Sequence, residues 1–475
     1  MTVRPFVYRF RKDLRLDDHA GLTAAASHGP VLPLLILDDD LCERLRLSPQ
    51  RAAFFCSAVT ALDADLRQHG SRLIVRRGAP KRELLRVLQE LHALGAGWSA
   101  AYDGNQIEND RALQSALEER GFVARMVHDA PAIPPDEITA VRGDDSRGYR
   151  AFAPYFQAWS ERSVKSYESP LLLRFARPEI ESGPLPQASD FGGQHVDGGG
   201  APLQGRRELE AFLDLRAADY AANYRIPSVD GTSRLSADLS FGTLSARSVV
   251  RAVAERAANP LAIGEQRRSL RLYLRSLARR DFFAQLSWFN PATGKEPLQG
   301  KMREFPWSTS HEALEAWRTG TTGFPLVDAG IRQLRATGWM HPHVRAVAAS
   351  LLCFDLGVDW RVGRSEWDRW LIEDDDAAAI GNWQWIAGVG ADMAQFPRIY
   401  NPQRQRRRFD PDAIYVRRWV EELRHVPVEA WRDAATDSPQ LTLALFADKR
   451  YAAPIVDHAH AARAFLRRYR QFLAP

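Results

Sequence analysis

Tryptophan is concentrated in the second half of this 475-residue chain. Eleven of its thirteen tryptophans follow residue 280, and Trp317, Trp360 and Trp383 stand beside Gly- and Asp-rich turns in a stretch of helical periodicity. A buried indole usually fills core volume and finds a hydrogen-bond partner for its N–H. A redox role for these side chains therefore depends on the residues around them.

Four consecutive acidic residues lie just before the last of these tryptophans. Glu373, Asp374, Asp375 and Asp376 precede the segment GNWQW, which contains Trp383 and Trp385. Such a run is either a solvated helix terminus or a set of acceptors for the ring N–H of a heterocycle. Arg345, about thirty residues upstream in a helical pattern, could neutralise one of these carboxylates.

A hydroxyl-rich segment, GTSRLS at residues 231–236, precedes an apolar-periodic run at 237–244. Hydroxyl side chains at a helix start cap free backbone N–H groups, and the same helix end offers those N–H groups to a phosphate. Taken alone, the segment is better interpreted as an ordinary N-cap.

The basic residues are almost all arginine, with six lysines among 64 cations and a net charge of +5. Arginine binds phosphates in bidentate fashion, but a GC-rich genome produces the same bias without functional meaning. The densest run, RQRRR at residues 404–408, either follows a nucleic-acid backbone or is a solvated loop.

Composition narrows the class of protein further. With 45% hydrophobic and 26% charged residues, the chain is globular, and its length favours two domains. No apolar run suits a membrane span or a signal peptide, so we expect a cytoplasmic protein without a membrane partner. We also expect a monomer. Cys42, Cys56 and Cys353 are too few and too dispersed for disulfides or a metal centre, so any redox cofactor must be organic.

The first 130 residues alternate between strand and helix periods. Expected strands cover 6–10, 31–37, 72–75, 98–102 and 122–127, and expected helices cover 51–69, 81–94 and 109–120. This rhythm predicts an α/β domain with a parallel, Rossmann-like sheet, whose ligand site lies outside the carboxyl ends of the strands at 9–16, 38–40 and 103–109. No GxGxxG follows the first strand, which disfavours a dinucleotide bound in the usual Rossmann manner.

The rest of the chain is predicted to be helical. We expect an interdomain linker over 131–205, clearest in the Pro- and Gly-rich stretch 183–205 with its triple glycine at 198–200, followed by an all-α domain over 206–475. Helical spacing recurs at 207–223, 244–258, 267–286, 324–337, 342–356 and 416–423.

A series of ordered motifs in this helical region resembles one known family. They are Tyr220 followed by GTSRLSADLSFGTLSAR, then GTTGFPLVDAGIRQLRATGWMHPHVR, DWRVG, EDDD, GNWQW, RIYNPQRQ, FDPD and YVRRWVEEL. Together they resemble the FAD-binding domain of the DNA photolyase/cryptochrome family, and the opening FRKDLRLDDHAGL resembles the antenna domain of that family. The resemblance covers essentially the whole chain.

The resemblance implies FAD held in a U-shaped conformation by the helical domain, and UV-damaged DNA as the partner. The implied cofactor-binding residues are Tyr220, Thr232, Ser233, Leu235, Ser236, Arg345, Glu373, Asp375 and Ala379. Glu373 and Asp375 would face the flavin, with Arg345 paired to Glu373. Trp317, Trp360 and Trp383 match the relay that carries electrons from the surface to the flavin. Trp339, Trp367 and Trp370 are interpreted as packing residues.

The implied lesion pocket departs from that of dimer-repairing members. Ser276 stands where a glutamate is expected, Arg279 where a stacking tryptophan is expected, and Pro342 where asparagine or histidine is expected. Serine is no comparable acid, and arginine offers a base a charged plane instead of an aromatic ring. Ala379 also lacks the side chain that normally hydrogen-bonds the flavin N5. Other residues expected at the DNA-facing side are His343, Trp385 and Arg398.

The antenna residues match only in part. Asn109 and Asp110 resemble the pair that grips a folate antenna, whereas Leu45 stands where those members carry a histidine. These residues leave open whether a second chromophore of folate or deazaflavin type is bound and which of the two it is.

Two functions follow from these residues. The first is a blue-light-driven DNA photolyase whose ordinary cyclobutane-dimer repair is weak or altered. The second is a cryptochrome-type flavoprotein that binds FAD, with or without DNA, and signals light or redox state without repair, through a partner that the sequence does not name.

Overall fold

The computed structural model describes residues 4–142, 145–167, 173–177, 180–193, 202–262, 264–308, 310–392, 397–432 and 451–474. The chain forms two compact units, which are described separately. Unit 1 comprises Met1–Ala218, Ser233–Gly294 and Ile372–Ala378, and unit 2 comprises Asp219–Thr232, Lys295–Leu371 and Ala379–Pro475. We expected domain boundaries at residues 130 and 205, but both positions lie inside unit 1. The triple glycine at 198–200 lies outside the described residues.

Unit 1 is built on a five-stranded parallel sheet of order β3-β2-β1-β4-β5. Its strands are β1 (Phe6–Phe10), β2 (Val31–Leu37), β3 (Ile74–Arg77), β4 (Gly95–Ser99) and β5 (Val123–Val127). The predicted α/β class is confirmed. Three strands begin within a residue of the expected positions, whereas β3 lies two residues later than expected and β4 three residues earlier.

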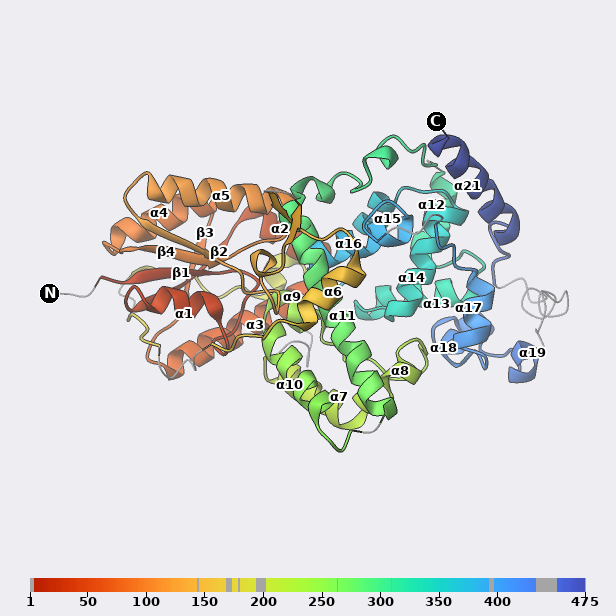
Figure 1. Ribbon diagram of the computed structural model, residues 1–475, viewed down its shortest axis with the longest axis horizontal. Coiled ribbons are helices and arrows are strands. Elements are labelled where there is room, and N and C mark those ends of the chain that lie inside the picture. Colours follow the sequence, from red (N-terminus) through yellow and green to blue (C-terminus); the bar gives the residue numbers. More distant parts are fainter. Residues whose placement is uncertain are drawn as a thin grey trace. The chain divides into compact units, whose positions relative to one another are not determined.

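Helices cover both faces of this sheet because the strands are apolar on both sides. In β1, Phe6, Tyr8 and Phe10 join the core beneath one layer of helices, while Val7 joins the core on the opposite face. The helices are α1 (Ala20–Ala26) and α3 (Pro49–Gln68) on the first face, and α4 (Pro80–Glu90) and α5 (Gly104–Glu118) on the second (Figure 1). The short α2 (Asp39–Leu47) follows β2.

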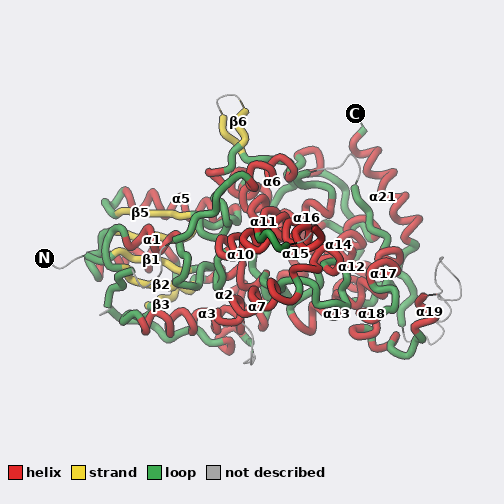
Figure 2. Tube along the Cα trace, turned by 60° about the horizontal axis from the view of Figure 1, so that its bottom comes forward, coloured by secondary structure: helices red, strands yellow, loops and turns green. Residues whose placement is uncertain are grey.

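The part of unit 1 outside the sheet is mainly helical (Figure 2). Residues 131–205 include a short hairpin, β6 (Ala140–Arg142) and β7 (Asp145–Arg147), and the helix α6 (Phe152–Ser160), in which Phe152, Tyr155 and Trp159 are buried. The expected linker therefore contributes core residues. The further helices of unit 1 are α7 (Pro202–Leu215), α9 (Ser236–Phe241), α10 (Ala246–Ala258) and α11 (Gly264–Phe289).

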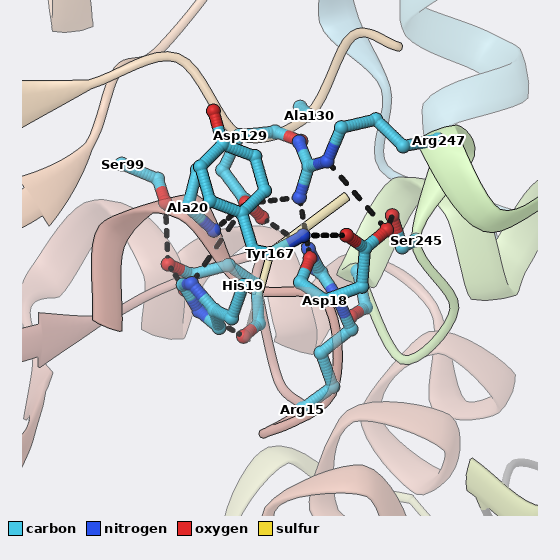
Figure 3. Close-up of polar contacts among 12 residues, drawn as sticks. Arg15, Asp18, His19, Ala20, Ser99, Asp129, Ala130, Tyr167, Ser245 and Arg247 are labelled. Atoms are coloured by element: carbon cyan, nitrogen blue, oxygen red, sulfur yellow. Dashed lines mark hydrogen bonds and ion pairs between the residues drawn. The ribbon is translucent and has the colours of Figure 1, made fainter. Parts of the chain in front are cut away.

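A buried charge network joins the α/β part of unit 1 to α10. Asp129 accepts hydrogen bonds from Arg15 and Arg247, both at 2.7 Å, and from the backbone N–H of Ala20 at 2.9 Å (Figure 3). Burial alone would raise the pKa of Asp129, but the charges of Arg15, His19 and Arg247 hold that pKa far below its usual value. The network therefore keeps an ionised carboxylate inside the unit.

The regular elements described in unit 2 are helices, apart from an isolated β-bridge between Ser308 and Val358. Its helices are α8 (Tyr220–Asn223), α12 (His311–Thr319), α13 (Pro325–Thr337), α14 (Pro342–Ser350), α15 (Trp360–Asp368), most of α16 (Asp376–Ala387), α17 (Pro402–Phe409), α18 (Ile414–Trp419), α19 (Val428–Arg432) and α21 (His458–Leu473). A π-helical turn, Leu351–Asp355, continues α14. One apolar core holds these helices together, and it includes Trp317, Trp360, Trp367, Trp383 and Trp431.

Candidate functional site

The three relay candidates lie on three helices of unit 2. Trp317 is on α12, Trp360 opens α15 and Trp383 is in α16. Their exposed fractions are 0%, 0% and 4%. Trp317 donates its Nε1–H to the carbonyl of Ala348 at 2.9 Å. Trp317 therefore lacks the exposed surface that the outer end of such a relay needs, and the relay itself stays a prediction.

Trp307 is better placed as an outer end. Its side chain is half-buried, and the next residue, Ser308, donates its N–H to the carbonyl of Gly357 at 2.6 Å and forms a β-bridge with Val358. Val358 lies two residues before Trp360. Local sequence patterns do not indicate this placement, because the bridge joins segments about fifty residues apart.

A fourth tryptophan, Trp367, contacts two of the three relay candidates. The ring centroids of Trp367 and Trp383 are 4.5 Å apart, and those of Trp367 and Trp317 are 5.7 Å apart in a stacked arrangement. Trp317 and Trp383 are 6.3 Å apart. The expectation that Trp367 only fills core volume did not anticipate this contact with both candidates.

The acidic segment lies in unit 1, where its members have different partners. Asp374 pairs with Lys12 at 2.7 Å and with Arg44. Burial raises the pKa of Asp374, but Arg44 and Lys12 outweigh this effect and hold it well below its usual value. Asp374 therefore anchors the segment, which is a structural role that the sequence did not reveal.

Asp375 is fixed in a different way. It accepts a hydrogen bond from Nε of Arg280 at 2.8 Å and another from the N–H of Ala378 at 3.0 Å. Arg280 is itself held by the carbonyls of Ala130 and Leu239. Asp375 is thus a half-buried, oriented acceptor, as recognition of a heterocycle or a ribityl hydroxyl requires. Glu373 next to it is also half-buried.

The hydroxyl-rich segment does not form the expected N-cap. Helix α9 begins at Ser236, its N-cap residue is Leu235, and no side chain caps it. The preceding residue, Arg234, has a left-handed backbone with φ of 55°. The hydroxyls of Thr232, Ser233 and Ser236 are therefore not used to cap α9.

The remaining cofactor candidates belong to unit 2. Tyr220 is buried and stacks on Tyr224 with ring centroids 5.3 Å apart. Arg345 on α14 donates from Nε to the carbonyl of Met340 at 2.8 Å, and Ala379 is half-buried in α16. The pairing of Arg345 with Glu373 stays a prediction.

Two lesion-pocket candidates lie on one side of α11. Ser276 is exposed and donates its hydroxyl to the carbonyl of Leu272 at 3.2 Å. The guanidinium of half-buried Arg279 lies 4.2 Å from the ring centroid of Phe152 in α6, and that of Arg275 lies 5.0 Å from the same ring. The ring of Phe152 thus fixes the guanidinium groups of both arginines. Residue 279, where a stacking tryptophan was expected, therefore presents a fixed guanidinium.

Other DNA-facing candidates lie in unit 2. Pro342 is exposed at the first turn of α14. His343 is buried, and burial together with Arg225 lowers its pKa to about 4. A neutral, buried imidazole is a poor phosphate contact, which argues against the role considered for His343. Arg398 is exposed and lies 5.8 Å from the ring centroid of half-buried Trp385.

The run at 404–408 lies within helix α17, so of the two alternatives the solvated loop is wrong. Arg406 is 4% exposed and donates to the carbonyls of Pro411 and Trp431. Arg404 and Arg408 are exposed, four residues apart on one helix face. Only part of this run is therefore available to a phosphate backbone.

A cavity of about 690 Å³ opens at the carboxyl ends of the strands in unit 1. All three segments expected there contribute to its lining, including Arg11, Asp38 and Asp103. Asp110 accepts two hydrogen bonds from Arg11, at 3.0 and 2.9 Å, while Asn109 lines the cavity. Leu45 is buried in the apolar core. Asp110 is thus already committed to an ion pair, unlike a residue waiting for a ligand.

No helix in the described part of the chain has the length and apolar character needed to cross a membrane. Among the same residues, no three His, Cys, Asp or Glu side chains gather in a way that could hold a metal ion.

Comparison with known proteins assigns this combination of an α/β unit and a helical unit to one family. Residues 273–471 match the FAD binding domain of DNA photolyase, and residues 6–172 match the DNA photolyase model. The deoxyribodipyrimidine photo-lyase of Halobacterium salinarum is 33% identical over 470 residues, covering 94% of this chain and 95% of that protein.

Solved structures agree. A class III photolyase from Agrobacterium tumefaciens superimposes with a TM-score of 0.85 at 28% identity, covering 99% of this chain and 98% of that one. The photolyase of Sulfolobus tokodaii, solved with two FAD molecules, gives a TM-score of 0.82 at 27% identity, covering 98% of this chain and all (100%) of that one. The chain belongs to the DNA photolyase/cryptochrome family, and the matched helical domain is an FAD-binding domain.

Proposed function

We propose that this protein is an FAD-dependent photolyase that uses blue light to transfer an electron to lesions in UV-damaged DNA, and that it repairs ordinary cyclobutane dimers weakly. The observation that carries the proposal is the altered α11, on which Ser276 and a held Arg279 replace an acid and an aromatic platform within a chain that matches photolyases over almost its whole length.

FAD, when bound, supplies light absorption and the transferable electron. The residues proposed to hold it are Tyr220, Thr232, Ser233, Leu235, Ser236, Arg345, Glu373, Asp375 and Ala379. The donor and acceptor set fits the group, because Asp375 is an oriented acceptor and α9 uses no hydroxyl as its cap. Ala379 offers no hydrogen bond to a ring nitrogen, so the protein contributes little at that atom to stabilising a reduced flavin.

We place the outer end of the electron relay at Trp307. Trp383 and Trp360 form the inner part, and the bridge between Ser308 and Val358 brings the segment of half-buried Trp307 beside that of Trp360. Replacing Trp307 with Phe should slow photoreduction by an external thiol, whereas replacing fully buried Trp317 should leave access of the thiol unchanged.

The chemistry of α11 explains why dimer repair is weak. A serine hydroxyl is no proton donor of carboxylic strength for a base carbonyl that gains charge. Arg279 presents a cation in place of an indole, and loss of base–aromatic stacking costs about 1–3 kcal/mol per base. The extrahelical lesion would therefore be held less tightly and protonated less effectively than in an intact pocket.

Arg398, Arg404 and Arg408 are proposed as phosphate contacts, since all three are exposed. Phosphate contacts position a protein on DNA and make binding sensitive to salt. Loss of one such contact should reduce the slope of log K against log salt by about 0.9 on duplex DNA.

The cavity in unit 1 is the proposed site of a second, light-collecting chromophore. Its volume of about 690 Å³ is ample for a bicyclic or tricyclic ring system. Because Asp110 is occupied by Arg11, the folate contact implied by the sequence is disfavoured, and a flavin-like antenna suits the cavity as well as a folate does.

One assay tests the repair proposal. Reduced holoprotein and blue light are applied to oligonucleotides that carry a cyclobutane dimer or a (6-4) product. We expect slow dimer repair by the natural protein and faster repair after the joint change of Ser276→Glu and Arg279→Trp, with lesion affinity rising roughly 5- to 150-fold from about 1–3 kcal/mol of stacking. Rapid dimer repair by the natural protein would refute the account of α11.

The alternative is a cryptochrome-type photoreceptor, which the loss of three pocket residues also favours. Normal photoreduction combined with no repair of either lesion, by the natural protein or by the variant, would favour this signalling function over repair.

A further inference from the structure

Four tryptophans, not three, meet at α15 in unit 2. Trp360 opens this helix, Gly363 follows one turn later and Trp367 one turn after that, so the three positions share a helix face. A Cβ atom added to Gly363 would lie 2.9 Å from Cζ3 of Trp383 and closer still to Cη2. The ring of Trp383 therefore rests on the bare backbone of Gly363, between the turns that carry Trp360 and Trp367.

The contact between Trp383 and Trp367 is tighter than that between Trp383 and Trp317. The ring centroids are 4.5 Å apart in the first pair and 6.3 Å apart in the second. Electron transfer between side chains slows steeply with distance, and an indole is among the most easily oxidised side chains. Trp367 is thus a competent electron donor to an oxidised Trp383.

Trp367 is in turn stacked on Trp317. Their centroids are 5.7 Å apart and their ring planes differ by 17°. Stacked π-systems share a positive charge, so the pair holds an electron vacancy more stably than a single indole does. Trp317 is 0% and Trp367 6% exposed, so the pair is shielded from water.

The surroundings of the two indole N–H groups make oxidation of this pair reversible. Trp317 donates its N–H to the carbonyl of Ala348, which is too weak a base to remove a proton. Nε1 of Trp367 is buried and has no partner among the described residues. An oxidised pair therefore has no base to take its protons and stays a radical cation.

We infer that Trp367 and Trp317 form a buried side branch of the electron relay, on which the positive charge rests reversibly beside Trp383. The inference rests on the proposed light-driven electron transfer to FAD. One electron leaves Trp383 for photoexcited oxidised FAD, and one electron then passes from the stacked pair to the Trp383 radical cation. The pair becomes a radical cation and keeps its protons, and it regains its electron from a solution thiol through Trp383, Trp360 and Trp307.

The test uses holoprotein with oxidised FAD and a short blue laser flash, with transient absorption at indole radical wavelengths as the readout. Trp360→Phe blocks the route to Trp307, and the radical cation should then persist on the branch. Adding Trp367→Phe should shorten the lifetime of the indole radical cation several-fold. An electron then returns directly from the flavin to oxidised Trp383. Trp431→Phe, which removes another buried indole of the same core, is the matched control in the Trp360→Phe background and should not shorten the lifetime.

Equal lifetimes with and without Trp367 would overturn the side branch. If Trp367→Phe fails to fold, Trp317→Phe in the same background gives the decision, since loss of the stacking partner should also shorten the lifetime.

Failure of the proposed function has a different signature. If the natural holoprotein forms no indole radical, or if Trp383→Phe leaves radical formation intact, then the electron relay itself is refuted and the branch with it. If Trp367→Phe merely fails to shorten the lifetime, only the side branch is refuted. Photoreduction through Trp360 then still stands.

Discussion

Asp129 and Arg247 form an ion pair of 2.7 Å with side chains only 1% and 3% exposed. Arg15 pairs with the other oxygen of the same carboxylate. Since Asp129 follows the last strand of the sheet and Arg247 belongs to α10, the pair fastens the helical part of unit 1 to its α/β part (Figure 3).

Replacing Asp129 with Asn should destabilise the protein by about 3–5 kcal/mol, because buried Arg15 loses its counter-charge and buried Arg247 keeps only its longer contact with Asp18. Urea denaturation followed by circular dichroism measures the change. Asp17→Asn is the matched control, since the pair of Asp17 and Arg206 is exposed and worth about 1 kcal/mol or less. A similar loss in both variants would contradict the role of Asp129.

The same pair should make stability depend on acid. The folded-state pKa of Asp129 is depressed, so its contribution is present above the unfolded value of about 3.9 and is lost as pH falls below it. The melting temperature of the natural protein should drop between about pH 5 and pH 2, and that of Asp129→Asn should drop less.

Asp238 should act in the opposite sense. Burial raises its pKa to about 6, against a hydrogen bond from Thr243, so the folded state binds a proton more readily than the unfolded state. Stability then falls as pH rises from about 4 to 6, by up to about 3 kcal/mol. The melting-temperature difference between Asp238→Asn and the natural protein should grow over that interval, and a constant difference would disprove the shift.

Gly363→Ala should displace the ring of Trp383, because the added methyl group would overlap both that ring and Leu352. Overpacking of this kind costs about 1–3 kcal/mol. Gly264→Ala is the control, because the space at Gly264 is open. We expect lower stability and slower photoreduction only for Gly363→Ala.

The cavity of unit 1 can be tested by filling it. Ala101 lines the cavity, and Ala101→Trp should reduce the amount of co-purifying second chromophore while leaving the FAD content unchanged. Fluorescence of the extract after heat release measures both. Ala24→Trp, on half-buried α1 surface outside the cavity lining, is the control. Equal chromophore content in both variants would place the antenna elsewhere.

Trp383→Phe should keep FAD bound and abolish photoreduction by blue light and thiol. Absorbance of the oxidised flavin before and after illumination gives both quantities. Trp419→Phe, a half-buried tryptophan on α18, serves as the control and should photoreduce at the natural rate. Photoreduction that survives in Trp383→Phe would refute the relay.

The sequence predicted local periods well. The bounds of β1 and β2 were predicted as found. Both faces of these strands are buried, so each strand is one continuous apolar segment in the sequence. The ends of β3 and β4 shifted because strand pairing with neighbours decides where hydrogen bonding starts. The run at 404–408 became a helix because Asn401 caps it and buried Arg406 is held by distant carbonyls.

Local patterns could not predict which side chains are buried or which distant segments are in contact. Nothing local distinguishes Trp317, which is sealed in the core, from Trp307, which is half-buried. Likewise, the acidic run gives no hint that Asp374 pairs with Lys12 and Arg44, more than 300 residues away in the chain. These contacts depend on which segments meet in three dimensions.

The distant position of Asp374 bears on how the protein is made. Lys12 and Arg44 leave the ribosome early, whereas their carboxylate partner emerges more than 300 residues later. At roughly 5–20 residues per second, this interval is on the order of tens of seconds. During translation Lys12 and Arg44 therefore remain without this carboxylate partner, and a chain that ends before residue 372 would lack the last segment of unit 1.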